Sequence, residues 1–456
     1  MALRPGSIGL VLPGLLLAML LAALDQTVMT PALPSVAGDL GGLDQMPAVI
    51  TAYLVAATVV MPVHGKLGDR FGRKPAMLAA IAVFVTGAAL CGLATSMPQL
   101  IAFRVVQGAG GGGLIIGAQA VIGELVSPRE RGRYLGLFGA AYVVAIVGGP
   151  LVGGFFVDQL SWRWIFAIYP PLGLLAFAVL AWSLRLPAPA ARPPVDCAGA
   201  LALATAVVGV VLLGQTGNPG WLVCALAGTA VWLLTTRYAA DPILPLRLFG
   251  EMAFAVPVGI SVLIGFALFG TLTYMPAFLQ IASGATATQA GLVVTTLMLG
   301  VLTSSVVSGR LITRTGRYKV FPVVGTAVAA CGLALLALLA PIAGPTAIGA
   351  VMLLTGLGVG LVMQVMVLAT QNAVDYRDLG TATSSVTFFR QIGASAGVAV
   401  TGALVTSGGA HDPAAFGGSL RTAFAVMTPL LGVAFLLALA LPARPLRTTA
   451  HVRGTA

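Results

Sequence analysis

Long apolar runs, each about the length needed to cross a membrane, recur along the whole chain. A membrane-spanning helix needs about 20 mostly apolar residues, because hydrocarbon offers its backbone no hydrogen-bond partners. A β-barrel would show alternating segments of about ten residues instead. The pattern predicts an all-α membrane protein with fourteen spans, at 8–30, 47–64, 76–95, 98–121, 134–157, 164–184, 198–214, 220–238, 254–279, 290–308, 320–341, 345–370, 380–406 and 421–441.

The composition excludes a soluble protein and a disordered chain. Hydrophobic residues make up 58% of the 456 positions and charged residues only 8%, whereas soluble proteins carry roughly 25% charged residues. The first run, 8–30, is longer than the apolar core of a cleaved signal peptide and further spans follow it, so we interpret it as a retained helix. The four cysteines have no disulfide or metal-ligand spacing.

The basic residues lie mainly in alternate loops. With the N-terminus in the cytoplasm, 20 of the 24 Lys and Arg residues lie on that side, and only Arg163 and Arg421 face outward. Arg104 and Arg390 fall inside spans. Basic residues favour cytoplasmic loops, so the bias predicts the orientation, with both termini cytoplasmic. It also explains the net charge of +11 without a nucleic-acid partner.

Two segments repeat at a fixed offset. The segment 65–73 matches 309–317 at five of nine positions, and Arg129–Gly132 resembles Arg377–Gly380. Related halves of this kind can rock about a site at the membrane midplane, which gives alternating access. We therefore predict an N-terminal six-helix bundle, a linker with two inserted spans, a C-terminal six-helix bundle and a cytoplasmic tail, at 1–184, 185–251, 252–441 and 442–456.

Several motifs resemble those of a transporter family. The segment Gly65–Lys74 resembles the signature loop of the major facilitator superfamily, and Leu24–Pro34 and Arg104–Gly108 resemble first-helix and fourth-helix motifs of its fourteen-spanner drug–proton antiporters. The antiporter motif of the fifth helix is matched by Gly136, Gly149, Pro150, Gly153 and Gly154. Trp162–Phe166, 274–280 and Arg390–Gly393 are further landmarks.

The resemblance implies a major facilitator fold and proton-coupled export from a bacterial cell across its inner membrane. Its partners would be a small-molecule substrate, protons and membrane lipids, and it would work as a monomer. The energy would come from the proton gradient, without a cofactor. In agreement, the glycine run 108–113 lacks the Lys-Ser/Thr that a nucleotide-binding loop requires.

Asp25 is the acidic residue that lies within a predicted span rather than in a loop or at a helix end. Burial disfavours the ionised form of an acid, so such a residue can bind and release protons as access alternates. Arg104 in the fourth span is its expected counter-charge, and Gln107 lies one turn later on the same face. The alternatives are a capping role for Asp25 and structural anchoring for Arg104 and Gln107.

The signature loop supplies a candidate cytoplasmic gate, with Gly65, Asp69, Arg70, Gly72, Arg73 and Lys74. A charged latch between the bundles would favour one of two global states. The alternative is that these positive charges only orient the helices in the membrane, and this explanation is sufficient to account for Lys74. Asp69 opposes that bias, and Thr313 takes its place in the second half. The small residues of the antiporter motif predict close helix packing along one stripe.

Substrate cavities are mostly apolar with a few polar groups. Candidate wall residues, each of which could equally be core packing, are Tyr53, Tyr142, Phe266, Phe269, Tyr274, Met298, Met363, Gln364 and Phe388. Spans 10 to 14 carry no acid, and span 13 carries Arg390. This weakens the case for cationic drugs and leaves neutral or anionic substrates open.

The sequence thus favours a proton-driven exporter of small amphipathic toxic compounds, such as antibiotics or secondary metabolites. A metabolite importer or exchanger of the same fold is the first alternative. A membrane sensor or scaffold is the second. An enzyme is not expected, because no paired carboxylates or His-rich site lie in the spans.

Overall fold

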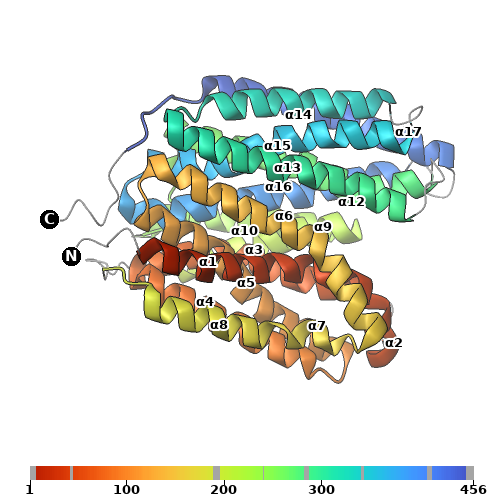
Figure 1. The fold of residues 1–456 in the computed structure, drawn as a ribbon, viewed down its shortest axis with the longest axis horizontal. Coiled ribbons are helices and arrows are strands. Elements are labelled where there is room, and N and C mark those ends of the chain that lie inside the picture. Colours follow the sequence, from red (N-terminus) through yellow and green to blue (C-terminus); the bar gives the residue numbers. More distant parts are fainter. Residues whose placement is uncertain are drawn as a thin grey trace.

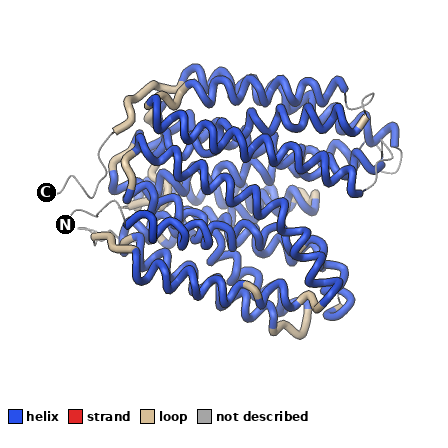
Figure 2. Tube along the Cα trace, viewed as in Figure 1, coloured by secondary structure: helices blue, strands red, loops and turns tan. Residues whose placement is uncertain are grey.

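A computed structural model describes residues 7–41, 45–187, 196–239, 241–281, 287–339, 344–407 and 413–447, and this described part contains helices and no strands (Figures 1 and 2). Arg4, Arg192 and Arg453, which we predict on the cytoplasmic side, lie outside the described residues. Figure 1 shows the long helices running roughly parallel to one another.

The helices form two groups with a pair between them. The first group holds α1 (Ser7–Val28), η1 (Thr30–Ala32), α2 (Leu33–Leu40), α3 (Met46–Phe71), α4 (Arg73–Gly92), α5 (Met97–Leu125), α6 (Pro128–Gln159), α7 (Arg163–Ala167) and α8 (Tyr169–Ser183). The pair is α9 (Cys197–Thr216) and α10 (Gly220–Tyr238). After α11 (Leu246–Phe249), the second group holds α12 (Met252–Ile281), α13 (Ala287–Thr315), α14 (Val320–Leu339), α15 (Pro345–Ala373), η3 (Tyr376–Asp378), α16 (Leu379–Ser407) and α17 (Pro413–Ala440).

Thirteen helices of the described chain are long and apolar enough to cross a membrane. The helix absent from this set, α16, corresponds to the predicted span 380–406 and is 29 residues long. Its first half is rich in Ser and Thr and carries Arg390, which lowers its hydropathy. The structure is therefore that of a multi-pass membrane protein, and the count of fourteen stays a prediction.

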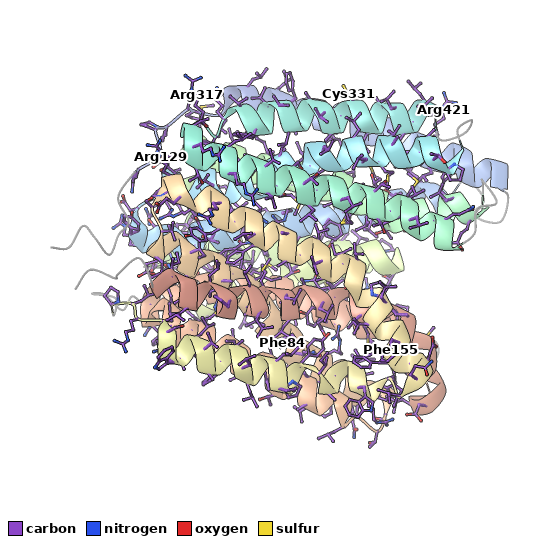
Figure 3. All side chains as sticks on the ribbon, in the orientation of Figure 1. Phe84, Arg129, Phe155, Arg317, Cys331 and Arg421 are labelled. Carbon is purple, nitrogen blue, oxygen red and sulfur yellow. The ribbon has the colours of Figure 1, made fainter. Side chains whose placement is uncertain are left out.

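The two groups meet along four pairs of helices: α6 with α13, α3 with α16, α6 with α15, and α5 with α16. The inserted pair packs through α9 against α3 and α16, so it lies beside this junction. Arg129 and Arg317 lie at one end of the molecule, called here the basic end, and Arg421 lies at the opposite end (Figure 3).

Two boundaries differ from the predicted ones. The span expected to end at residue 64 continues through the signature segment to Phe71, and Gly72 with φ +96° and ψ 151° turns the chain into α4. The matching Gly316, which directly follows α13, also has positive φ, +71°, although α14 begins only at Val320. The expected single span 164–184 corresponds to one candidate span, Arg163–Ser183, which is interrupted at Ile168 between α7 and α8, just before Pro170 and Pro171, because proline cannot continue the hydrogen-bond ladder.

The glycine run of α5 allows three helices to approach one another closely. A Cβ atom on Gly108 or Gly112 would collide with the backbone of α3 at Tyr53 and Ala57, and one on Gly110 would collide with α4 at Phe84. Membrane helices use small residues in this way to bring their backbones into van der Waals contact. The run therefore sets the position of α5 at the centre of the first group.

We predict that Gly72→Ala and Gly316→Ala each destabilise the protein by about 1–3 kcal/mol, because an L side chain is strained in this backbone region. Thermal unfolding in detergent would measure the loss. Gly432→Ala is the control, since Gly432 lies within α17 and a Cβ added there would meet nothing within 4 Å. Equal melting temperatures for all three variants would contradict the prediction.

Candidate functional site

Three polar side chains predicted from the sequence meet inside the first group. The Arg104 guanidinium donates through Nη1 to Oδ2 of Asp25 (2.7 Å) and to Oε1 of Gln107 (3.0 Å). Nε2 of Gln107 donates to Oδ1 of Asp25 (2.9 Å). None of the three side chains is more than 1% exposed. The carboxylate is thus held by one ion pair and one amide, without access to solvent in this conformation.

Aromatic rings enclose this buried cluster. The Arg104 guanidinium carbon lies 4.4 Å from the centre of the Tyr53 ring and 6.0 Å from that of Phe166. Tyr53 donates its hydroxyl proton to the carbonyl of Ala22 (3.2 Å). An arginine over an aromatic face gains a cation–π attraction that is largest when water is excluded. Tyr53, predicted as a cavity wall, therefore lies inside the first group and supports Arg104.

Tyr169 also belongs to this cluster, although no sequence pattern pointed to it. Its hydroxyl is buried and lies close enough to the Asp25 carboxylate to interact with it electrostatically. Its ring packs edge-on against Phe84 at 5.3 Å. Tyr169 begins α8 at the proline break, so this break positions a hydroxyl beside the carboxylate.

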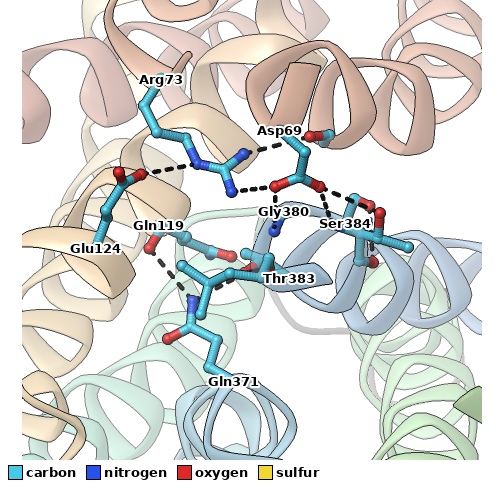
Figure 4. Close-up of polar contacts among 11 residues, drawn as sticks. Asp69, Arg73, Gln119, Glu124, Gln371, Gly380, Thr383 and Ser384 are labelled. Atoms are coloured by element: carbon cyan, nitrogen blue, oxygen red, sulfur yellow. Dashed lines mark hydrogen bonds and ion pairs between the residues drawn. The ribbon is translucent and has the colours of Figure 1, made fainter. Parts of the chain in front are cut away.

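The signature segment connects the two groups at the basic end (Figure 4). Asp69 at the end of α3 accepts hydrogen bonds from the backbone N–H groups of Gly380 (3.2 Å) and Thr381 (3.1 Å) and from the Thr381 hydroxyl (3.2 Å). These N–H groups belong to the first turn of α16, where the helix dipole favours a negative charge. Asp69 thus caps a helix of the opposite group.

Arg73 completes this contact from the start of α4. Its guanidinium pairs with Asp69 and with Glu124 of α5, whose Oε2 lies 3.3 Å from Nε, and it donates to the carbonyl of Gly65 (3.3 Å). A Cβ on Gly65 would lie 2.6 Å from the Gly380 carbonyl oxygen, so only glycine permits this approach of α3 and α16.

Three other basic residues of the segment make contacts elsewhere. Lys74 donates to the carbonyl of Ala181 in α8 (2.6 Å), within its own group. Arg70 lies over the ring of Phe71 at 5.0 Å. Lys66 pairs with Asp241 in the linker after α10. Among the predicted gate residues, Asp69, Arg73 and Gly65 therefore make the inter-group contact, and Lys74 anchors α4 to α8.

The corresponding contact at the end of α13 is made by a basic side chain at a helix C-terminus instead of an acidic side chain at a helix N-terminus. Thr313, at the position that matches Asp69, bonds to Gly309 of its own helix (2.9 Å). Arg129 of α6 donates instead to the carbonyls of Thr313 (3.4 Å) and Arg314 (3.3 Å), at the end of α13. A cation suits a helix C-terminus as an anion suits an N-terminus, so the two contacts are electrostatic counterparts.

An uncharged polar layer, which we did not predict, lies next to the Asp69 contact (Figure 4). Gln371 of α15 donates to Thr383 of α16 (2.9 Å) and to the Gln119 carbonyl of α5 (3.3 Å), and Thr387 donates to the Gln119 side chain (3.3 Å). All four side chains are buried. The layer adds directional bonds between the groups where lipid and water are both excluded.

The small residues of α6 do not lie on one stripe. A Cβ on Gly149 or Gly153 would collide with α1 at Thr27 and Val28, whereas one on Gly136 would lie 2.8 Å from the Ser305 carbonyl oxygen in α13. Gly154 has open space around it, and Pro150 is exposed. The motif therefore packs one part of α6 against α1 and another part, near Gly136, against α13 of the second group.

The remaining candidate cavity residues differ in burial. Met298, Met363, Gln364 and Phe388 are at most 7% exposed and belong to the packed interior. Tyr142, Phe266, Phe269 and Tyr274 are half-buried. In the described residues, no group of three or more His, Cys, Asp or Glu side chains converges as a metal site would require.

An exposed ion pair marks the end opposite the basic end. Arg163 Nη1 lies 2.6 Å from Oδ2 of Asp39, to which the indole of Trp162 also donates (3.0 Å). These bonds, chiefly that from Arg163, hold the pKa of Asp39 below its usual value. They connect α2 to the start of α7 outside the spans.

Comparison with known proteins gives consistent likenesses. A model of the Major Facilitator Superfamily matches residues 15–397 and 257–455. An uncharacterised MFS-type transporter of Mycobacterium tuberculosis is 40% identical over 414 residues, which are 88% of this chain and 60% of that protein. A multidrug transporter protein of Bacillus subtilis, MdtP, is 35% identical over 408 residues, 87% of this chain and 75% of that protein.

The chain thus spans less than two thirds of the length of its mycobacterial relative. Among solved structures, the proton:xylose symporter XylE has the same fold, with a TM-score of 0.71 over 99% of both chains and 16% sequence identity.

We predict that Arg104→Met destabilises the protein by about 3–5 kcal/mol, because it leaves the Asp25 carboxylate buried and unpaired. The double variant Asp25→Asn/Arg104→Met should recover much of this loss, since it removes both charges. Melting temperatures in detergent would measure both effects. Arg163→Gln, which breaks the exposed pair with Asp39, is the control and should lower stability far less. A double variant no more stable than Arg104→Met would contradict the prediction.

Proposed function

This chain belongs to the major facilitator superfamily, and from that premise we propose that it is a proton-driven exporter of small amphipathic toxic compounds. The observation that carries the proposal is the buried Asp25–Arg104–Gln107 cluster. Charged groups inside a membrane bundle are costly and are retained where they function. The names of relatives that are multidrug transporters favour export over uptake.

Asp25 is the group through which a proton would act. In the present state its charge is balanced by Arg104, with the Oδ2–Nη1 distance of 2.7 Å. Protonation removes the ion pair, so the guanidinium loses its strongest partner and α1 loses its main polar tie to α5. The protonated and deprotonated proteins would thus favour different positions of α1, which is the requirement for coupling.

A continuous set of contacts leads from Asp25 to the basic end. Thr27, two residues later in α1, donates to the carbonyl of Ala145 in α6 (3.0 Å), and Gly149 packs against the same Thr27. Helix α6 also carries Arg129 and Gly136, which contact α13 at the inter-group surface. A shift of α1 would therefore displace the helix that closes this surface.

We take the basic end as cytoplasmic, in keeping with the distribution of Lys and Arg. The Asp69 and Arg129 contacts then close the cytoplasmic side, and the present conformation is closed inward. The two helix groups would act as the rocking bundles, and the latch would break when the carrier opens to the cytoplasm. Both termini would lie in the cytoplasm, and the membrane would be the bacterial inner membrane.

We predict that Asp25→Asn reduces proton-driven efflux roughly 5- to 150-fold, the range of ordinary coupling energies, because the amide cannot carry the proton. Drug accumulation in everted vesicles under an imposed pH gradient would measure it. Asp158→Asn is the matched control, since Asp158 is an acid at the end of α6 and away from the buried cluster. Gradient-dependent accumulation at the wild-type rate in Asp25→Asn, or uptake by right-side-out vesicles, would rule out the mechanism.

We also predict that Asp69→Asn opens the basic end. Hydrogen bonds to a charged group contribute about 1.5–3 kcal/mol, so removing the charge should raise the open population roughly tenfold or more. Spin labels at positions 71 and 377, both exposed and on opposite sides of the contact, would report a longer distance. Asp375→Asn, an exposed acid beside η3, is the control. Identical distance distributions in all three proteins would contradict the role of Asp69.

A further inference from the structure

Arg390 lies within the predicted span 380–406, and no described residue forms an ion pair with it. It is the twelfth residue of α16, about 17 Å along the helix from the basic end at 1.5 Å per residue. Its Nη1 atom is buried without a hydrogen-bond partner, and within the described chain its guanidinium has no ion pair. Arg104, by contrast, has a carboxylate, an amide and a ring as partners.

One side chain of the opposite group, that of Tyr142 in α6, interacts electrostatically with Arg390. The Tyr142 hydroxyl donates to Oε1 of Gln26 in α1 (3.4 Å). Both Tyr142 and Arg390 are half-buried. The surface between the groups therefore presents a guanidinium from α16 and two hydrogen-bonding side chains from α1 and α6.

Helix α12 packs against α16 at the level of Arg390. Helix α12 packs so closely here that a Cβ on Gly265 would collide with the Arg390 backbone. The next residue, Phe266, is half-buried. Binding sites for amphipathic molecules combine apolar walls with a few polar groups of this kind.

Arg390 differs from the buried charges of the two contacts described above. Asp25 is neutralised by Arg104, and Asp69 by Arg73 and the start of α16. An arginine in a membrane interior needs a partner, and its planar guanidinium matches a carboxylate, sulfonate or phosphate.

We propose that Arg390 binds the anionic head group of the transported compound, with Tyr142 and Gln26 as hydrogen-bonding neighbours and Phe266 beside its apolar body. This inference rests on the proposed export function and specifies its substrate class: amphipathic organic anions.

Binding of a matched pair of probes to the purified full chain in phosphatidylcholine nanodiscs tests the proposal. The probes are 2-naphthoate and its neutral methyl ester, which share one ring system. We expect the wild type to bind the carboxylate at least tenfold more tightly than the ester. Arg390→Gln should remove this preference and leave ester binding unchanged. Arg390→Lys should retain part of it, because lysine keeps the charge but not the planar fork.

Arg421→Gln is the control, because Arg421 is exposed at the opposite end of the molecule (Figure 3). Equal affinities for the two probes in the wild type, or an undiminished preference in a folded Arg390→Gln, would overturn the proposal. Displacement of naphthoate by phosphatidylglycerol added to the nanodiscs would also overturn it, because the anion would then be a lipid head group.

These experiments distinguish a failure of the anion-binding proposal from a failure of the export proposal. If Arg390→Gln still exports the neutral ester under a pH gradient, proton-driven export stands whatever the naphthoate affinities are. If Asp25→Asn exports at the wild-type rate while the wild type prefers naphthoate, the anion site stands and the coupling mechanism fails.

Discussion

A charge that is buried within a bundle of apolar helices needs a partner, and this constraint organises the structure. The pair formed by Asp25 and Arg104 is its clearest expression, because each side chain is 1% exposed and each satisfies the other. Removing one partner of such a pair is far more costly than removing both. The pair therefore ties α1 to α5 in this structure, and in the proposed mechanism protonation of the carboxylate would release α1.

The same constraint shapes the contact between the helix groups. Asp69 and Arg129 reach across to opposite helix termini, so backbone dipoles supply much of the compensation that side chains supply for Asp25. The buried Gln119 and Gln371 add a layer in which amides and hydroxyls satisfy one another. Such bonds depend on short distances, and glycines at positions 65 and 136 allow the backbones to approach. A modest separation of the helices would break many of these bonds together.

The sequence was informative where a residue type is rare in its surroundings. A lone acid in an apolar span and an arginine with a glutamine one turn later were sufficient to predict the cluster of Asp25, Arg104 and Gln107. The positive φ of Gly72 and Gly316 shows that both repeated segments end their helix at a glycine of this kind.

The side of a helix on which a residue lies was much less predictable, because a helix that is apolar on all sides has no polar face from which to orient it. Tyr53, a predicted cavity residue, lies beside Arg104. Gly136 and Gly149 are 13 residues apart, about 220° around the helix at 3.6 residues per turn, so one motif contacts two different helices. Gln119 and Gln371 were missed because an isolated amide in a span gives no indication of its partner in a distant helix.

The proposed binding of an organic anion at Arg390 would have an energetic consequence for the transport cycle. A carrier that exchanges one inward proton for one outward organic anion moves two elementary charges across the membrane in the same electrical sense. Each charge corresponds to about 2.3 kcal/mol per 100 mV, so an interior-negative membrane would drive expulsion even where the pH on the two sides is equal. Both the membrane potential and the pH gradient would drive such a carrier.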